Sequence, residues 1–145
     1  MNKILFATFL ILLSAINVYG SEERGNIHVT IEGLKSSEGY VRIRLYNSKD
    51  GFPRSGEKAL ATERVKIGKG KAQSTFRDLP YGDYAIGILH DENGNDRMDL
   101  KWGFFPSEGA GVSNNPKPGL VPPSFEEAKV SLKKSDLKLN INIYY

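Results

Sequence analysis

The chain of 145 residues contains no cysteine. This absence excludes disulfide bonds, thiolate zinc sites, cysteine nucleophiles and a lipidated N-terminal cysteine. Histidine is also scarce, and with only His28 and His90 any scheme that needs three histidines is excluded. A strong excess of one charge is lacking too, because 20 lysines and arginines stand against 17 aspartates and glutamates. The basic residues are scattered along the chain, so the sequence does not indicate a nucleic-acid partner.

The sequence has one long apolar run, at its N-terminus. Residues 1–20 place Lys3 before an apolar segment and end with small residues at Val18 and Gly20. This pattern is typical of a secretory signal peptide that is cleaved after Gly20. The alternative, a retained membrane anchor, is less favoured because the run is shorter than the roughly 20 residues that span a bilayer. We therefore expect a secreted or periplasmic protein whose mature part, residues 21–145, is a single domain without a transmembrane segment.

Apolar residues alternate with polar residues along most of the mature chain, whereas helix signals are sparse. Residues 83–90 are apolar on both faces, which predicts a central strand, and residues 33–39 read as a hairpin loop. Ser124 and Glu127 have the spacing of a capping box, which predicts a single helical turn. Seven short strands with polar turns predict an all-β fold, an antiparallel seven-stranded β-sandwich with one long Gly/Pro-rich loop. The alternation places the strands at residues 26–32, 40–46, 62–67, 71–77, 83–90, 128–133 and 137–144.

Residues 91–123 form a long connection with little alternation. Its last 22 residues contain four glycines and five prolines. Structureless connections of this length inside a compact domain are usually functional or mobile. Because this one also contains Trp102, Phe104 and Phe105, we expect part of it to pack on the sandwich, with these aromatic side chains filling core beneath the loop.

The start of this connection carries the one motif with recognisable chemistry. Asp91, Asn93, Asn95 and Asp99 place side-chain oxygens at positions one, three, five and nine, and the backbone carbonyl of Arg97 fits position seven. Calcium takes six to eight hard oxygen ligands, and alternating carboxylates and amides on a tight loop supply them. The sequence therefore predicts calcium as a cofactor at this loop.

The motif departs from an EF-hand loop at its end. Position twelve, where that loop has a bidentate glutamate, is Trp102, so Glu92 or Glu108 would have to replace the missing ligand. Two alternatives remain open beside calcium. One is a plain turn in which the Asp and Asn side chains cap backbone amides, and the other is a transition metal that uses His90.

Several short segments are specific in combination, although each one alone is weak. They are residues 45–46 with 51–53, 79–85, 90–95 with Asp99, 108–115 and 122–128. Together they resemble a bacterial secreted family catalogued as domain-of-unknown-function family 2141, over nearly the whole mature chain. One departure is Ala110, where family members often carry an aromatic residue.

The family resemblance implies a fold and a compartment but no chemistry, because the family has no established activity. Residues 79–85 also resemble the turn-then-strand signature of transthyretin-like and collagen-adhesin B-type modules. This likeness implies a prealbumin-like or Ig-like sandwich of seven strands.

Three functional hypotheses follow. We favour a non-catalytic module that binds a carbohydrate or an envelope protein. A hydrolase with His90 as base and Ser113 as nucleophile is less favoured, because no nucleophile elbow, zinc-protease motif or phosphate loop accompanies these residues. The third hypothesis is a structural accessory of the envelope that docks a partner through a sheet edge or the long loop. The candidate ligand-binding residues are His90, Trp102, Phe104, Phe105, Asn114 and Asn115.

Overall fold

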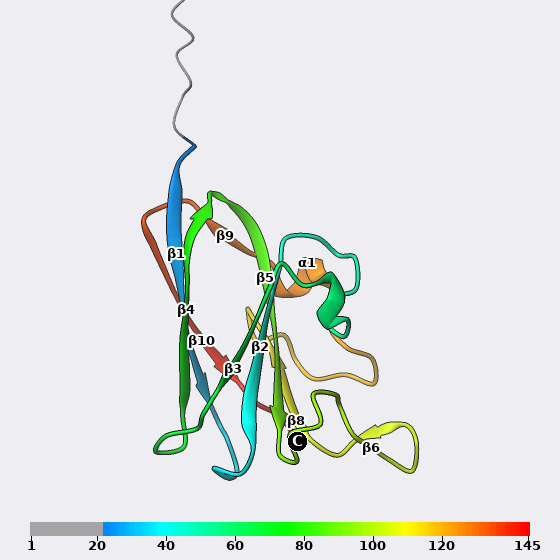
Figure 1. Ribbon diagram of the computed structural model, residues 1–145. Coiled ribbons are helices and arrows are strands. Elements are labelled where there is room, and N and C mark those ends of the chain that lie inside the picture. Colours follow the sequence, from blue (N-terminus) through cyan, green and yellow to red (C-terminus); the bar gives the residue numbers. More distant parts are fainter. Residues whose placement is uncertain (1–21) are drawn as a thin grey trace, which may run out of the picture.

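The computed structural model describes residues 22–145, and the predicted signal peptide lies outside the described residues (Figure 1). The described chain is all-β, as the sequence predicts, but it has more than the seven strands expected. No helix within it has both the length and the apolar character needed to cross a bilayer. The strands are β1 (Arg24–Glu32), β2 (Tyr40–Tyr46), β3 (Ala61–Val65), β4 (Ala72–Pro80), β5 (Gly82–Asp91), β6 (Leu100–Lys101), β7 (Phe105–Pro106), β8 (Gly109–Val112), β9 (Val130–Leu132) and β10 (Asp136–Asn142).

Two main sheets make up the fold. One has the order β10-β1-β4, and the other has the order β3-β2-β5-β8, with β9 paired to the start of β5. The pair of β1 and β10 is parallel, which corrects the expectation of a purely antiparallel fold. The reason is that β9 runs toward the end of the molecule where β1 begins. The short turn after β9 therefore starts β10 beside the first residues of β1, where the N–H of Asn26 donates to the carbonyl of Ser135.

The connection at residues 33–39 is not a hairpin loop, because β1 and β2 belong to different sheets. It carries the chain across from one sheet to the other and ends at Gly39. This residue has a φ of +66°, and a Cβ there would lie 2.0 Å from the carbonyl oxygen of Asp91. Glycine is therefore needed at this point, where the start of β2 meets the end of β5.

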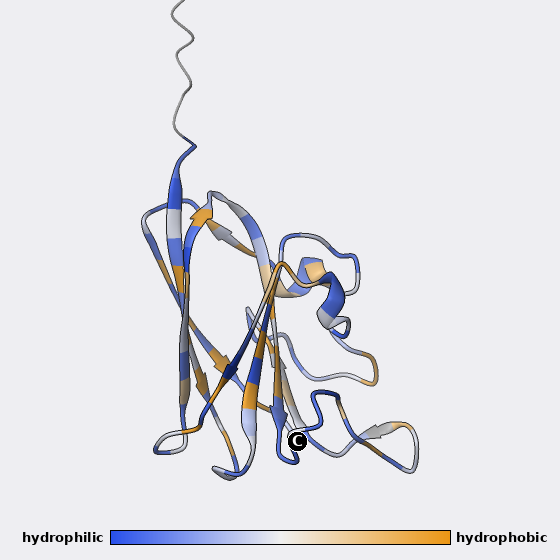
Figure 2. Ribbon diagram, viewed as in Figure 1, coloured by the Kyte–Doolittle hydropathy of each residue, from blue (hydrophilic) through white to orange (hydrophobic). Residues whose placement is uncertain are grey.

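The main core lies between the two sheets. The alternating residues of β1 (Ile27, Val29, Ile31) face those of β2 (Val41, Ile43, Leu45), and all six are buried. Figure 2 shows apolar and polar residues alternating along these strands. The prediction that β5 is central is confirmed, since it pairs with β2 on one side and β8 on the other and is buried from Tyr84 to Asp91.

A smaller cluster of buried residues packs beside α1 (Phe125–Ala128), the helical turn that Figure 1 shows next to the second sheet. Phe52 packs edge-on against Tyr46 and Phe125, with ring centroids 5.2 and 5.9 Å apart. The predicted capping box is confirmed, because the Ser124 hydroxyl accepts the N–H of Glu127 while the Glu127 carboxylate accepts the N–H of Ser124. The helical turn thus fixes the far end of the long connection onto the sheet.

Candidate functional site

The loop at residues 91–99 leaves the end of β5 and folds around the buried carboxylate of Asp91. Asp91 is 0% exposed. One of its oxygens accepts the N–H groups of Gly94 at 2.7 Å and Asn95 at 3.1 Å, and the other accepts that of Asp96 at 2.9 Å. The accepted N–H groups lie three, four and five residues ahead of Asp91, so its carboxylate caps a whole turn of backbone from residue 94 to residue 96. This turn sets the path of the whole loop.

A second buried carboxylate, that of Glu108, closes the loop from the other side. Glu108 is 5% exposed. Its two oxygens accept the N–H of Glu92 at 2.9 Å and that of Asp99 at 3.1 Å, so one side chain holds both ends of the loop. The sequence indicated Glu108 only as a substitute metal ligand. Its clamping role had no sequence signal, because it depends on the return of the chain after residue 99.

Arginines of β2 hold the loop against the second sheet. The carboxylate of Asp96 pairs with Arg42, whose Nε lies 3.8 Å from the Asp91 carboxylate. Arg44 donates a hydrogen bond to the backbone carbonyl of Asp96 at 3.3 Å. Burial lowers the pKa of Arg42, and the neighbouring charge of Arg64 lowers it further. Because it lies beside both carboxylates, the guanidinium of Arg42 supplies positive charge to Asp91 and to Asp96.

The remaining predicted calcium ligands converge on Asp99. The side-chain amides of Asn93 and Asn95 both donate to its carboxylate. The amide oxygens of the same two residues accept the N–H groups of Asn95 and Arg97, at 3.0 and 3.1 Å. To bind calcium, both amides would have to turn their oxygens toward Asp99 and give up these backbone bonds.

The structure thus gathers Asp91, Asn93, Asn95 and Asp99 on one loop, with the N–H of Arg97 bonded inside it. Among the described residues, no three or more histidine, aspartate or glutamate side chains form a metal-binding group. Calcium at this loop stays a prediction.

His90 is fully buried, and both of its ring nitrogens are engaged. Because the carbonyl of Glu38 can only accept, Nε2 carries the proton and donates to it at 2.9 Å. The N–H of Lys35 donates to the hydroxyl of Tyr145 at 3.1 Å, and that hydroxyl is hydrogen-bonded to Nδ1 of His90. The imidazole therefore links Tyr145 to the connection before β2.

Ser113, the nucleophile of the hydrolase hypothesis, is also buried and bonded to the backbone. Its hydroxyl donates to the carbonyl of Ala128 at 2.6 Å and accepts the N–H of Ile86 at 2.9 Å. This arrangement joins β5, the end of β8 and α1. It gives no support to a catalytic pair of Ser113 and His90.

Asn114 and Asn115 close loops of the fold. Asn114 donates to the carbonyl of Glu127 at 2.9 Å. Asn115 donates to the carbonyl of Asn140 at 2.8 Å and accepts the N–H of Asn142 at 2.9 Å, so its side chain pairs with the edge of β10 as a strand would. Both residues follow the end of β8, whereas the predicted aromatic residues precede its start. The structure does not bring the two groups together.

The aromatic residues lie on a small hairpin made by β6 and β7, in which Leu100 pairs with Pro106 and Lys101 with Phe105. Figure 1 shows that this hairpin stands out from the two sheets. Trp102 is 74% exposed and Phe104 is 68% exposed. The expectation that they fill core is wrong for both, because the hairpin pairs with itself and turns these side chains outward. The side chain of Phe105 lies outside the described part of the structure.

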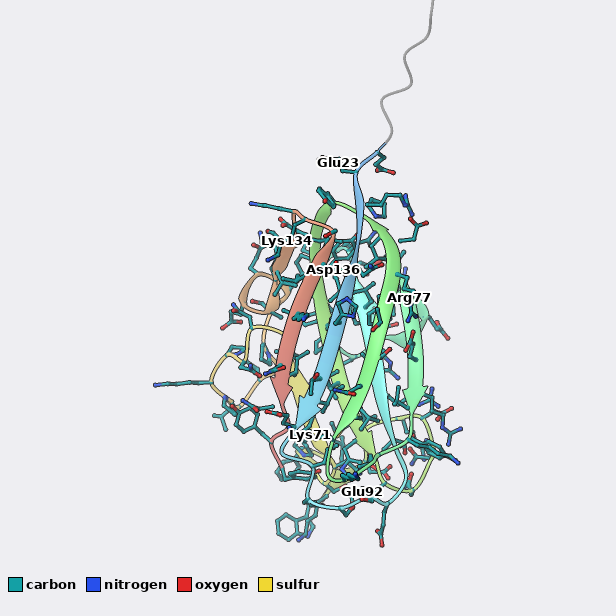
Figure 3. All side chains as sticks on the ribbon, turned by 90° about the vertical axis from the view of Figure 1, so that its left-hand side faces the viewer. Glu23, Lys71, Arg77, Glu92, Lys134 and Asp136 are labelled. Carbon is teal, nitrogen blue, oxygen red and sulfur yellow. The ribbon has the colours of Figure 1, made fainter. Side chains whose placement is uncertain are left out.

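A polar row that the sequence did not reveal crosses the outer face of the first sheet, the face turned to the viewer in Figure 3, where Asp136 is labelled. His28 of β1 bonds Thr75 of β4 at 3.0 Å and Asp136 of β10 at 2.8 Å. The hydrogen bonds from His28 and Asn26 lower the pKa of Asp136. A groove of about 430 Å³ runs beside the row. These contacts could not be predicted from the sequence, because the residues are far apart in the chain and meet only through the order of the strands.

Comparison with known proteins assigns the chain to a family. No curated protein and no solved structure matches it. One family model, described as "Uncharacterized protein conserved in bacteria (DUF2141)", matches residues 29–140. The match extends from β1 to β10, so it includes both sheets, the loop at residues 91–99 and the aromatic hairpin. The resemblance seen in the sequence is thereby confirmed, and the chain belongs to the bacterial family DUF2141.

Proposed function

We propose that this protein is a secreted or periplasmic, non-catalytic binding module whose binding element is the hairpin of residues 100–106. The observation that carries the proposal is the outward position of Trp102 and Phe104 at the tip of this hairpin. Large aromatic side chains make a substantial contribution to binding when a partner covers them. Scattered exposed apolar residues are ordinary, but two aromatic residues on one projecting turn are a recognition feature.

The backbone of Trp102 supports the same proposal. Trp102 and Gly103 form the turn of the hairpin with φ angles of +55° and +81°. A β-turn whose two central residues both have positive φ angles favours Asn-Gly there, because a bulky side chain is disfavoured in the left-handed region. Tryptophan at this position therefore strains the backbone, and such strained positions cluster at binding and catalytic sites.

The base of the hairpin is well anchored. The N–H of Ser107 donates to the carbonyl of Asp99 at 2.9 Å, and Asp99 is itself held by Glu108. A binding element that is already ordered loses less conformational entropy when its partner binds. We assign the carboxylate loop at residues 91–99 the role of a rigid platform, which calcium would stiffen further if it binds there.

The export of the protein and the type of its β-sandwich are inferred mainly from the sequence. The pattern of residues 1–20 supports export. We also infer a prealbumin-like sandwich, supported by the residue 79–85 signature and by the shared core of the two sheets. The strands beyond the expected seven are then additions to that frame.

Sedimentation with isolated bacterial cell envelopes tests the binding role. We expect the exported protein to sediment with the envelopes and the Trp102→Asn variant to remain in solution. Leu120→Asn is the matched control, since Leu120 is fully exposed on a different part of the long connection, and it should bind as the native protein does. Equal sedimentation of the native protein and Trp102→Asn would overturn the proposal.

A further inference from the structure

We propose that the partner of the hairpin is the surface of an anionic lipid bilayer, an inference that rests on the binding role proposed above. The hairpin would insert its tip among the lipid headgroups while the two sheets stay in water. Three features of the described residues carry this inference: the apolar tip, the charge beside it, and the engagement of the nearby polar side chains.

The tip has the composition of a membrane-interface element. Trp102 and Phe104 lie at the turn, and Leu100, 50% exposed, stands just below them. Tryptophan is enriched at the level of lipid headgroups, because its ring is apolar while its N–H remains near water. A narrow turn that projects from the body, as Figure 1 shows, can reach this level without bringing the sheets into contact with lipid.

The charge of the hairpin is complementary to anionic headgroups. The Nζ of Lys101 lies 4.9 Å from the centre of the Trp102 ring, and Arg97 is exposed three residues before the hairpin. Among the acids that precede the hairpin, Asp96 pairs with Arg42 and Glu92 pairs with Lys35. The Asp99 carboxylate keeps its charge but is held inside the loop by the amides of Asn93 and Asn95. Basic side chains beside an apolar tip attract anionic lipids and keep their charged ends at the surface.

The polar side chains that would bind a carbohydrate are engaged elsewhere. A sugar site sets hydrogen-bonding groups beside an aromatic ring to recognise hydroxyls. The amides of Asn93 and Asn95 are bonded within their own loop. Those of Asn114 and Asn115 hold Glu127 and the edge of β10. The structure therefore favours an apolar, anionic surface over a polyhydroxyl ligand.

The expected attachment is reversible. One hairpin buries little apolar area, and even a single myristoyl chain gives only marginal membrane binding. Lys101 and Arg97 add an electrostatic attraction that falls off within a Debye length, about 10 Å at 0.1 M salt. Binding should therefore need anionic lipid and should weaken as salt is added.

Trp102 is the only tryptophan in the sequence, so its fluorescence reports directly on the hairpin. The exported protein is mixed with vesicles of phosphatidylcholine alone, or with phosphatidylglycerol added. With the anionic vesicles we expect the emission to shift to shorter wavelength and brominated lipid to quench it. High salt should reverse both effects, and Lys101→Gln should weaken binding several-fold. Phe104→Ser should also weaken it, while Leu120→Asn should not change it.

A parallel sedimentation with purified peptidoglycan separates this inference from the proposed function. Binding to anionic vesicles, with no retention on peptidoglycan, supports the lipid surface. If the protein ignores the vesicles but binds peptidoglycan in a way that Trp102→Asn abolishes, the lipid inference is overturned while the binding role stands. If it ignores both and Trp102→Asn sediments with whole envelopes as the native protein does, both proposals fail. Envelope binding that depends on Trp102, without vesicle binding, also overturns the lipid surface.

Discussion

The carboxylate of Glu108 accepts the backbone N–H of Asp99 at 3.1 Å, next to the first residue of the aromatic hairpin. The same carboxylate accepts the N–H of Glu92 at the other end of the loop. One buried charge thus sets the distance between the end of β5 and the start of β6. The position of the exposed aromatic residues depends on a residue that is itself almost inaccessible to water.

Glu108→Gln is therefore expected to loosen the loop. One of the two oxygens becomes an N–H donor facing a backbone N–H, and hydrogen bonds to charged groups contribute about 1.5–3 kcal/mol each. We predict a loss of about 2 kcal/mol in the free energy of unfolding and faster amide exchange at residues 92 and 99. The exposed Glu126→Gln is the control. Unchanged exchange in Glu108→Gln would show that the clamp does not form.

Trp102→Asn is expected to stabilise the protein while removing binding. Asparagine tolerates the left-handed conformation found at this position and completes an Asn-Gly turn. The free energy of unfolding should rise by about 1 kcal/mol in denaturant melts. Phe104→Asn, the control on the same hairpin, should stay within about 0.5 kcal/mol of the native protein. A destabilised Trp102→Asn would mean that Trp102 supports the fold.

Ser113→Ala tests the structural role of the hydroxyl. The substitution leaves the carbonyl of Ala128 and the N–H of Ile86 without their buried partner. Each unsatisfied buried group costs about 1–3 kcal/mol, so we predict a loss of at least about 2 kcal/mol, measured by urea denaturation. Ser107→Ala, at an exposed position, should change little. Full native stability in Ser113→Ala would contradict the packing described for β5, β8 and α1.

Asp136 gives the protein an acid-sensitive contact. Its pKa is lowered by hydrogen bonds from His28 and Asn26, so the stability it contributes is present above the unfolded pKa of about 3.9. That contribution is lost as the pH falls through the lower folded value. As the pH falls from about 5 to about 2, a range that includes the ordinary pKa of an aspartate, the melting temperature of the native protein should fall more steeply than that of Asp136→Asn. Parallel curves would show that the contact with His28 does not persist in solution.

Calcium is tested best at Asp99. Asp91→Ala would disrupt the loop whether or not an ion binds, because the Asp91 carboxylate accepts three backbone N–H groups. We predict that millimolar calcium raises the melting temperature relative to chelator, and that Asp99→Asn abolishes the rise. Arg42→Gln should enlarge it, because the Nε of Arg42 lies 3.8 Å from the Asp91 carboxylate and its positive charge opposes a cation there. If the melting temperature of the native protein is the same in millimolar calcium as in chelator, the site is rejected.

Local patterns predicted seven of the strands but missed β6, β7 and β8, which lie in the segment expected to be a long loop, and they could not predict which strands pair. The alternation from Tyr40 to Tyr46 gave the exact bounds of β2, and Ser124 with Glu127 marked the helical turn. The crossing of residues 33–39 between sheets and the parallel pair of β1 and β10 are set by packing across the core, which alternation along one strand does not encode.

The candidate site shows the same division between local and distant information. The turn around Asp91 follows from residues within five positions of it, so its chemistry was visible in the sequence. Glu108, just before β8, and Arg42 of β2 reach the loop from elsewhere in the chain and were not recognised as its anchors. The outward aromatic residues were misplaced because apolar residues are normally buried, and an exposed binding element breaks that rule.

Quenching of Trp102 fluorescence by acrylamide, without and with isolated cell envelopes, tests most directly whether the hairpin is the binding element. We expect efficient quenching of the protein alone, because Trp102 is exposed, and strong protection once the protein sediments with envelopes. Equal quenching in the bound and unbound protein would contradict the claim that the hairpin is the binding element.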